Sequence, residues 1–186
     1  EASKKYYNEF LSCFKKLNFS FDLFTQTHTE YHSSSVKDFI LELYNKGYIY
    51  EKDIEQVYCE ECGEFLSDRY IEGKCPICGG EALGDQCLEC SEIFEAEILN
   101  KKCKICGSEP VIKDTSHLFF ALSKFENDVR RLYIKQQGWR KNAEVITKRY
   151  LDEGLRDRAV TRDFNWGIDV PLSGYEDKKI YVWIEA

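Results

Sequence analysis

Apolar residues before the cysteine-rich middle of the chain recur first at a helical and then at a strand-like spacing. Between residues 36 and 44 they fall at i, i+3, i+4, i+7 and i+8, which predicts an amphipathic helix. The serines at 33–35 are N-cap candidates, and Gly47 is the expected C-terminal stop. Residues 48–59 then predict a strand that leads into the first cysteine. The apolar positions of the helix are Val36, Phe39, Ile40, Leu43 and Tyr44.

After the cysteines, strand and helix patterns alternate again. Residues 110–120 predict a strand, the apolar positions from Leu122 to Tyr133 predict a helix ending near Gly138, and a second helix is expected over 142–151. Residues 161–179 are rich in turn formers, and residues 179–186 predict a buried closing strand. The pattern as a whole is typical of an α/β chain with an insert in its middle.

The middle section contains four Cys-x-x-Cys pairs, several of them followed by glycine. A Cys-x-x-Cys turn directs two thiolates at one ion, and a second such turn completes a four-sulfur shell, so eight thiols predict two zinc sites. These sites are expected to be structural, because four sulfurs leave no open position for a catalytic water. The predicted ligands are Cys59, Cys62, Cys75, Cys78, Cys87, Cys90, Cys103 and Cys106.

A disulfide framework is the alternative for these cysteines, and the sequence disfavours it. The chain has no signal peptide, no apolar run long enough to span a membrane, and 32% charged residues. Closely spaced pairs in such a chain are typical of metal ligands in a reducing compartment. We therefore expect a cytoplasmic protein with no membrane partner.

The cysteine segment is an internal repeat. Residues 59–81 align with residues 87–109 without a gap, and all four cysteines of each copy coincide. Either each copy closes its own zinc site, or the sites are nested, with the second and third pairs forming an inner site and the first and fourth an outer one. The spacing alone does not decide between these pairings.

Charge and chain ends narrow the function further. The net charge of −7 argues against a chain that is a nucleic-acid-binding surface throughout. A local run of basic residues between 130 and 149 is interpreted as a solvated helix face, and acids outnumber bases in residues 59–109.

The chain starts at Glu1, lacks Met and ends after IYVWI, which predicts a fragment of a longer protein.

Ordered sequence blocks resemble the methionyl-tRNA synthetase family. FLSDRYIEGKCPICGGEALGDQCLEC is similar to the family's connective-peptide insert, and HLFFALSKFENDV, GLRDRAVTRDFNWGIDVP and KIYVWIEA follow in the family's order. Residues 21–59 resemble the stretch that leads into this insert. The resemblance covers nearly the whole chain. It implies the following fold class: α/β, part of a class I Rossmann-type catalytic core with a parallel sheet, interrupted by a zinc-knuckle insert.

The resemblance also implies an activity and a division of the chain. Residues 1–55 would belong to the catalytic core, 56–112 to the insert, and 113–186 to the return into the core. The family activates methionine with ATP and Mg to methionyl-adenylate and transfers it to the 3′ end of tRNA(Met). No obligate protein partner is indicated. Because family members that lack one knuckle lose a contiguous inner or outer half, the nested pairing is favoured.

Three residues match positions of the family's active site. Trp183 corresponds to the tryptophan that packs against the methionine side chain, and a polarizable thioether gains from an aromatic face. Ala186 corresponds to a small residue of the same pocket, and Arg162 to an arginine of the active-site region that would hold an anionic group. The alternatives are a core role for Trp183 and a loop ion pair between Arg162 and Asp163.

The two ATP-binding signatures of class I synthetases, HIGH and KMSKS, are absent from the sequence. The resemblance places them upstream and downstream, so we expect the chain to be inactive alone. The rival interpretation is a stand-alone zinc-ribbon module that binds nucleic acid or protein. A class I synthetase for an aliphatic amino acid is a further rival, but it would carry a much larger editing insert.

The remaining candidate side chains are interpreted as structural. We expect His28 and His32 to be structural or exposed, His117 to be packed, and Cys13 to be a buried apolar residue. Trp166 is expected to pack its own loop. No arrangement typical of a nucleophilic triad or a glycine-rich phosphate loop is visible.

Overall fold

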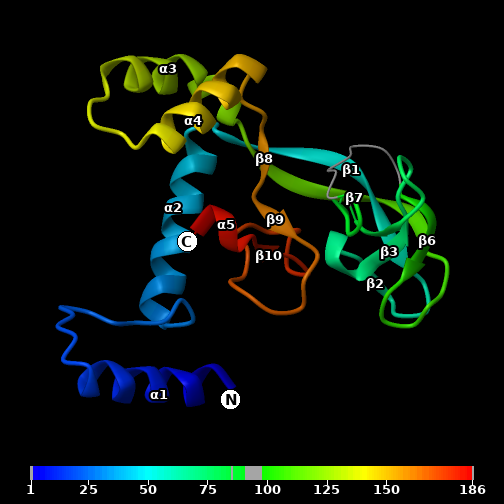
Figure 1. Ribbon diagram of the computed structural model, residues 1–186, viewed down its shortest axis with the longest axis horizontal. Helices are drawn as coiled ribbons and strands as arrows, with labels where there is room; N and C mark the ends of the chain where they lie inside the picture. Colours follow the sequence, from blue (N-terminus) through cyan, green and yellow to red (C-terminus); the bar gives the residue numbers. More distant parts are fainter. Residues whose placement is uncertain (1, 85, 91–97, 186) are drawn as a thin grey trace.

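An antiparallel ribbon of two long strands forms the middle of the molecule (Figure 1). In this computed structural model, which describes residues 2–84, 86–90 and 98–185, β1 (Ile49–Cys59) pairs with β7 (Val111–Phe120). The register runs from Ile49 opposite Phe120 to Tyr58 opposite Val111. The short strands β2 (Glu64–Phe65) and β8 (Arg158–Ala159) flank the ribbon, in the order β2-β1-β7-β8. Both long strands confirm the pattern-based prediction.

The cysteine-rich segment forms a second small sheet at the far end of the ribbon (Figure 1). Its strands lie in the order β5-β4-β3-β6, next to a single 3₁₀ turn, η1 (Asp68–Tyr70). Its core contains four buried cysteines but only a few apolar side chains, Leu66, Ile71, Ala82 and Ile98. The strands are β3 (Ile71–Lys74), β4 (Glu81–Leu83), β5 (Gln86–Cys87) and β6 (Leu99–Cys103).

Every strand pair that the structure describes is antiparallel. The parallel sheet implied by the resemblance therefore has no counterpart among the described residues. Mixed helix and strand content is confirmed.

The predicted amphipathic helix is α2 (Glu30–Asn45), which starts earlier than the apolar spacing suggests. Its N-cap is Thr29, whose hydroxyl accepts a hydrogen bond from the backbone N–H of His32 at 3.2 Å, so the expected caps at 33–35 were wrong. Polar residues continue the first turn because only the later turns face the core. Gly47 does terminate the helix, with φ +73° and the Tyr48 N–H bonded to the Leu43 carbonyl.

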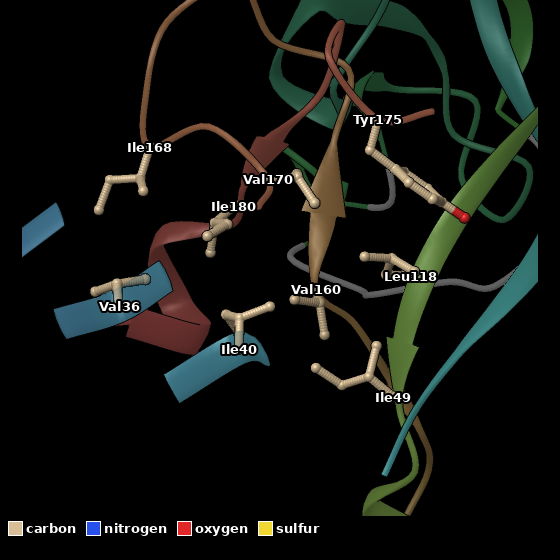
Figure 2. Close-up of a cluster of buried hydrophobic side chains, with 9 residues drawn as sticks. All are labelled: Val36, Ile40, Ile49, Leu118, Val160, Ile168, Val170, Tyr175 and Ile180. Atoms are coloured by element: carbon tan, nitrogen blue, oxygen red, sulfur yellow. The ribbon is translucent and has the colours of Figure 1, made fainter. Parts of the chain in front are cut away.

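The main hydrophobic core joins α2 to the base of the ribbon and to the C-terminal segment (Figure 2). Residues far apart in the sequence meet there, which makes these three parts one packed unit. Figure 2 shows the side chains converging from α2, β1, β7 and the segment after residue 159. They are Val36, Ile40, Ile49, Leu118, Val160, Ile168, Val170, Tyr175 and Ile180.

The region after the ribbon contains the two predicted helices. A 3₁₀ turn, η2 (Leu122–Phe125), leads into α3 (Glu126–Lys135), and α4 (Lys141–Glu153) follows, ending at Gly154. The basic residues of these helices pair with acids one turn away, as in Lys148–Asp152 at 2.5 Å and Arg149–Glu153 at 3.8 Å. Such exposed pairs agree with a solvated helix face.

The C-terminal segment corrects the prediction of a buried strand over 179–186. Only β10 (Lys179–Ile180) is a strand, paired with β9 (Thr161–Arg162), and the chain then turns into α5 (Val182–Glu185). Ile180 at the end of β10 is buried in the main core, and Ile184 of α5 packs against it. A short run of mixed apolar and aromatic residues does not distinguish a helical from a strand period.

The first helix, α1 (Ala2–Lys16), was not predicted from the pattern. Its aromatic residues pack against the loop that follows, with Phe14 contacting Phe19, Phe21 and Phe24 at ring separations of 5.1–5.4 Å. Cys13 is exposed, so the expectation of a buried Cys13 was wrong. Over the described part of the chain, every helix is too short or too polar to cross a membrane.

Replacing Ile40 with alanine tests the main core. Ile40 is 1% exposed, and removing its buried methyl groups should lower the free energy of unfolding by about 2–5 kcal/mol in urea denaturation of the zinc-loaded protein. Phe39→Ala is the matched control on the same helix, because Phe39 is 52% exposed and should cost about 1 kcal/mol or less. Equal effects of the two substitutions would contradict this packing.

Candidate metal centres and substrate-binding residues

The eight paired cysteines gather into two groups of four sulfurs. Within each group all sulfur atoms lie within 4.8 Å of one another. The first and fourth pairs form the outer group, and the second and third pairs form the inner group, so the geometry is that of the nested alternative. The outer group is Cys59, Cys62, Cys103 and Cys106, and the inner group is Cys75, Cys78, Cys87 and Cys90.

The ribbon explains why the outer pairs meet although more than forty residues separate Cys59 from Cys103. Cys59 is the last residue of β1, and Tyr58 lies opposite Val111 of β7, so the chain just before β7, which carries Cys103 and Cys106, returns to Cys59. The inner group forms at a tighter turn, because β4 and β5 are adjacent and Ala82 lies opposite Cys87. Strand pairing therefore selects the nested arrangement over the sequential one.

The sulfur separations fit a tetrahedral zinc ion. Four sulfurs at a Zn–S distance of 2.3 Å stand roughly 3.8 Å apart in a regular tetrahedron. The measured separations are 3.4 Å for Cys59–Cys106, 3.8 Å for Cys62–Cys103 and 3.5 Å for Cys78–Cys87. These distances are too long for a disulfide, and no disulfide joins any two of the nine cysteines. The donor set of four thiols suits zinc.

Backbone N–H groups around the inner group point at the sulfurs. Cys75 Sγ accepts from the N–H groups of Ile77 and Cys78 at 3.4 and 3.5 Å, and Cys87 Sγ accepts from Glu89 and Cys90 at 3.3 Å each. The tight turn at Cys75–Cys78 uses the left-handed backbone of the glycine that follows it, and Gly79 has φ +76°. Such bonds stabilise thiolates and orient them toward an ion.

One thiol in each group is already acidic without a metal. A hydrogen bond from the Ser108 hydroxyl is the main cause that lowers the pKa of Cys106 to about 6. The backbone N–H of Cys90 is the main cause that lowers the pKa of Cys87 to about 6. A hydrogen bond with the Cys106 sulfur instead raises the pKa of Cys62. A thiolate is the ligand form, so each group holds a sulfur prepared for a cation at neutral pH.

Arg162 lies on β9 beside the last strand of the chain. Its guanidinium donates to the Thr161 carbonyl at 3.0 Å and lies over the Tyr181 ring at 4.0 Å. The alternative ion pair with Asp163 is absent among the described residues, because Asp163 binds Lys178 and His117 instead. Stacking on an aromatic ring leaves most guanidinium donors available for an anion.

Trp183 lies on α5, shortly after Tyr181. Its side chain is 76% exposed, so the alternative of a core tryptophan at the end of a buried strand is contradicted. Ala186, expected in the same pocket, lies outside the described residues. The structure thus brings Arg162 and the helix that carries Trp183 to one region through the pairing of β9 with β10.

A cavity of about 360 Å³ lies between α5, the loop 164–169 and the start of α2. Trp166 lines it and is 78% exposed, which contradicts the expectation that this tryptophan packs its own loop. His28 lines the same cavity, and because α2 starts at Glu30, His28 and His32 do not share a helix face. His32 instead contacts Glu185 of α5, Nε2 to Oε2, at 2.6 Å.

Sequence reasoning missed a buried polar cluster next to Arg162. His117 is fully buried, as expected for a packed residue, but it binds Asp163 and Thr161 rather than apolar neighbours. Lys178 is also buried. The sequence signal was the polar and charged residues in an otherwise apolar strand context, and their partners lie 15 to 63 positions away.

Solved structures share this fold. Mycobacterium tuberculosis methionyl-tRNA synthetase in complex with methionyl-adenylate superimposes with a TM-score of 0.61 and 20% identity, over 95% of this chain and 30% of that one. The free form of the same enzyme gives a TM-score of 0.62 at 19% identity. At this identity the likeness concerns the fold alone, which is that of a class I synthetase.

The chain belongs to the family described as tRNA synthetases class I (M), whose model matches residues 1–186. The methionine–tRNA ligase of Bacillus cereus (strain B4264) is 50% identical over 190 residues, and methionine–tRNA ligase 1 of Alkaliphilus oremlandii (strain OhILAs) is 49% identical over 188. Each match covers all of this chain and 35% of the relative, so the chain spans about a third of the relatives' length.

Single cysteine substitutions test the two centres by native mass spectrometry. The zinc-loaded chain should carry two ions, and Cys59→Ser and Cys103→Ser should each leave one, because a three-sulfur site binds zinc more weakly. The double variant Cys59→Ser/Cys103→Ser should still keep one ion, because both sulfurs belong to the outer group, whereas Cys59→Ser/Cys75→Ser should keep none. The exposed Cys13→Ser is the control and should keep both ions. Loss of both ions from Cys59→Ser/Cys103→Ser would contradict the nested sites.

Proposed function

We propose that this chain is the section of a methionyl-tRNA synthetase that carries a two-zinc insert and part of the methionine site. The enzyme activates methionine with ATP to methionyl-adenylate and transfers the methionyl group to the 3′ end of its tRNA. The single observation that carries the proposal is the match of the whole chain to the family, together with relatives about 50% identical that are named methionine–tRNA ligases.

Two zinc ions complete the proposal for the insert, one in each group of four cysteines. The tetrahedral sulfur spacing and the N–H···S bonds support this assignment. The ions are structural, because each shell is filled by four thiols. The insert has few buried apolar side chains, so metal binding supplies much of its folding free energy.

The division into core and insert follows the two hydrophobic clusters. Residues 1–55 and 113–186 contribute the main core, and residues 56–112 contain the cysteine core. The boundaries fall on the far half of the ribbon, where Gln56 lies opposite Lys113 and Val57 opposite Ile112. The insert is thus held to the catalytic part through paired strands rather than through a flexible linker.

Trp183 binds the methionine side chain in this proposal. Its exposed ring offers a flat face to the thioether, and sulfur–aromatic contact adds to the burial of apolar surface. Ala186 keeps space for the ligand in the same pocket. Arg162, with donors available beyond its stacking on Tyr181, holds a carboxylate or phosphate of the reactants. ATP with Mg is a substrate that the rest of the enzyme binds.

The tRNA is the macromolecular partner, and the insert guides its acceptor end over the active site. A cytoplasmic location belongs to this proposal, because closely spaced cysteine pairs that bind metal are typical of a reducing compartment. A stand-alone zinc-ribbon module is not favoured, because the ribbon that carries the cysteines continues into the main core through Ile49 and Leu118.

Methionine-dependent ATP–pyrophosphate exchange by the full-length enzyme tests this function. Trp183→Ala should raise the KM for methionine about tenfold or more, since that corresponds to about 1.4 kcal/mol of lost contact, and should change the KM for ATP much less. Trp183→Phe should lie between Trp183→Ala and the parent enzyme.

Trp139→Ala is the control, because Trp139 packs against Tyr133 in the helical region and should leave the KM for methionine unchanged. An unchanged KM in Trp183→Ala would remove Trp183 from the methionine site. Exchange that does not depend on methionine would overturn the proposed function itself.

A further inference from the structure

A cluster of buried polar side chains lies between the ribbon and the segment that carries Arg162. Asp163 is its centre. Its Oδ1 accepts from Lys178 Nζ at 2.5 Å, and its Oδ2 lies 2.9 Å from His117 Nε2. Thr115 Oγ1 is 3.3 Å from Oδ2 and accepts from Lys178 Nζ at 2.8 Å. His117 is also bonded through Nδ1 to Thr161 Oγ1 at 2.8 Å.

These side chains come from three separate segments. Thr115 and His117 alternate on β7 and therefore face the same side of the ribbon. Thr161 and Asp163 flank Arg162, and Lys178 precedes β10. Figure 1 places β9 and β10 beside the ribbon, so the cluster spans the contact between them.

Because the cluster is buried, the loss of any one of its hydrogen bonds would cost stability. His117 and Thr161 are 0% exposed and Lys178 is 6% exposed, so an unpaired charge there would be costly. Burial by itself would raise the pKa of Asp163, but His117 and Lys178 outweigh it and hold the pKa below its ordinary value, so the carboxylate is charged. Apolar side chains would bury the contact at less cost, whereas directional bonds set one relative position.

The bonds of the cluster also fix the backbone position of Arg162. Both neighbours of Arg162 in the chain are bonded into the cluster, and the Leu118 N–H donates to Thr161 Oγ1 at 3.1 Å. The Arg162 guanidinium in turn donates to the Thr161 carbonyl. Movement of Asp163 would therefore displace the backbone from which Arg162 extends.

We propose that Asp163 is a positioning residue that holds Arg162 and the cysteine-bearing ribbon in one fixed relation. Through His117 it fixes the ribbon, and through its own backbone it fixes Arg162. The inference rests on the proposed function, because it assigns the buried cluster to the alignment of the insert with the active site. Asp163 itself touches no substrate.

Kinetics of full-length Asp163→Asn test the role in catalysis. The exchange kcat should fall about tenfold or more, because displacements near 1 Å cost up to about a hundredfold. The KM for methionine should stay within about twofold, since Trp183 is held by α5. The KM for tRNA should rise in aminoacylation. Asp152→Asn is the matched control, because Asp152 is an exposed carboxylate of α4 bound by Lys148 at 2.5 Å, and it should behave as the parent enzyme.

A double variant separates positioning from stability. Asp163→Asn with Lys178→Met removes both charges, so its Tm should return toward that of the parent, while kcat stays low because the bonds to His117 and Thr115 are not restored. Recovery of kcat together with Tm would overturn the proposal, as would parent-like kinetics of Asp163→Asn.

Amide hydrogen exchange gives a readout that does not depend on activity. In Asp163→Asn, backbone amides of residues 160–165 and 115–118 should exchange faster than in the parent enzyme, while these amides should not change in the Asp152→Asn control. Unchanged amide hydrogen exchange in Asp163→Asn would overturn the proposed positioning role of Asp163. If the parent enzyme shows no methionine-dependent exchange of pyrophosphate, the proposed function fails. The amide measurement still tests whether Asp163 holds the segment around Arg162 to the ribbon.

Discussion

The pairing of β1 with β7 is the interaction on which the rest of this molecule depends. It runs from Ile49 and Phe120, at the main core, to Tyr58 and Val111, at the cysteine-rich sheet. Two parts that share no hydrophobic core are thereby linked by a continuous row of backbone hydrogen bonds. A ribbon of this kind resists bending more than a single strand or loop, so the insert is carried at a defined place relative to α2 and the C-terminal segment.

The cysteine-rich sheet shows how a small segment forms a core from thiols. Among the described residues, four of the eight in its buried core cluster are cysteines, and the apolar remainder is small. Strand pairing brings the outer pairs together from opposite ends of the segment, so the outer group also closes the segment as a loop. Closing a long loop removes much entropy from the unfolded chain, which makes the outer site the larger constraint of the two.

The buried charges near Arg162 show a different use of the same ribbon. One face of β7 contributes Leu118 to the apolar core, and the other contributes Thr115 and His117 to the polar cluster. Because successive side chains of β7 point to opposite faces, the same strand contributes to the apolar core and to the charged cluster. The polar cluster lies between the insert and Arg162, one of the residues that resemble the family's active site.

The sequence by itself determined the family, the two long strands, three helices and the eight metal-ligand candidates, because these depend on local spacing and on motifs. It also contained the helical spacing of α1, where Tyr6, Phe10 and Phe14 stand four positions apart, but this signal was missed. It did not determine the helix at Val182–Glu185, where a short apolar run fits both periods. Only the tertiary structure decided which cysteines share a site, since strand register sets that choice. It also decided that Trp183 is exposed and that Asp163 binds His117 and Lys178, because long-range packing brings such partners together.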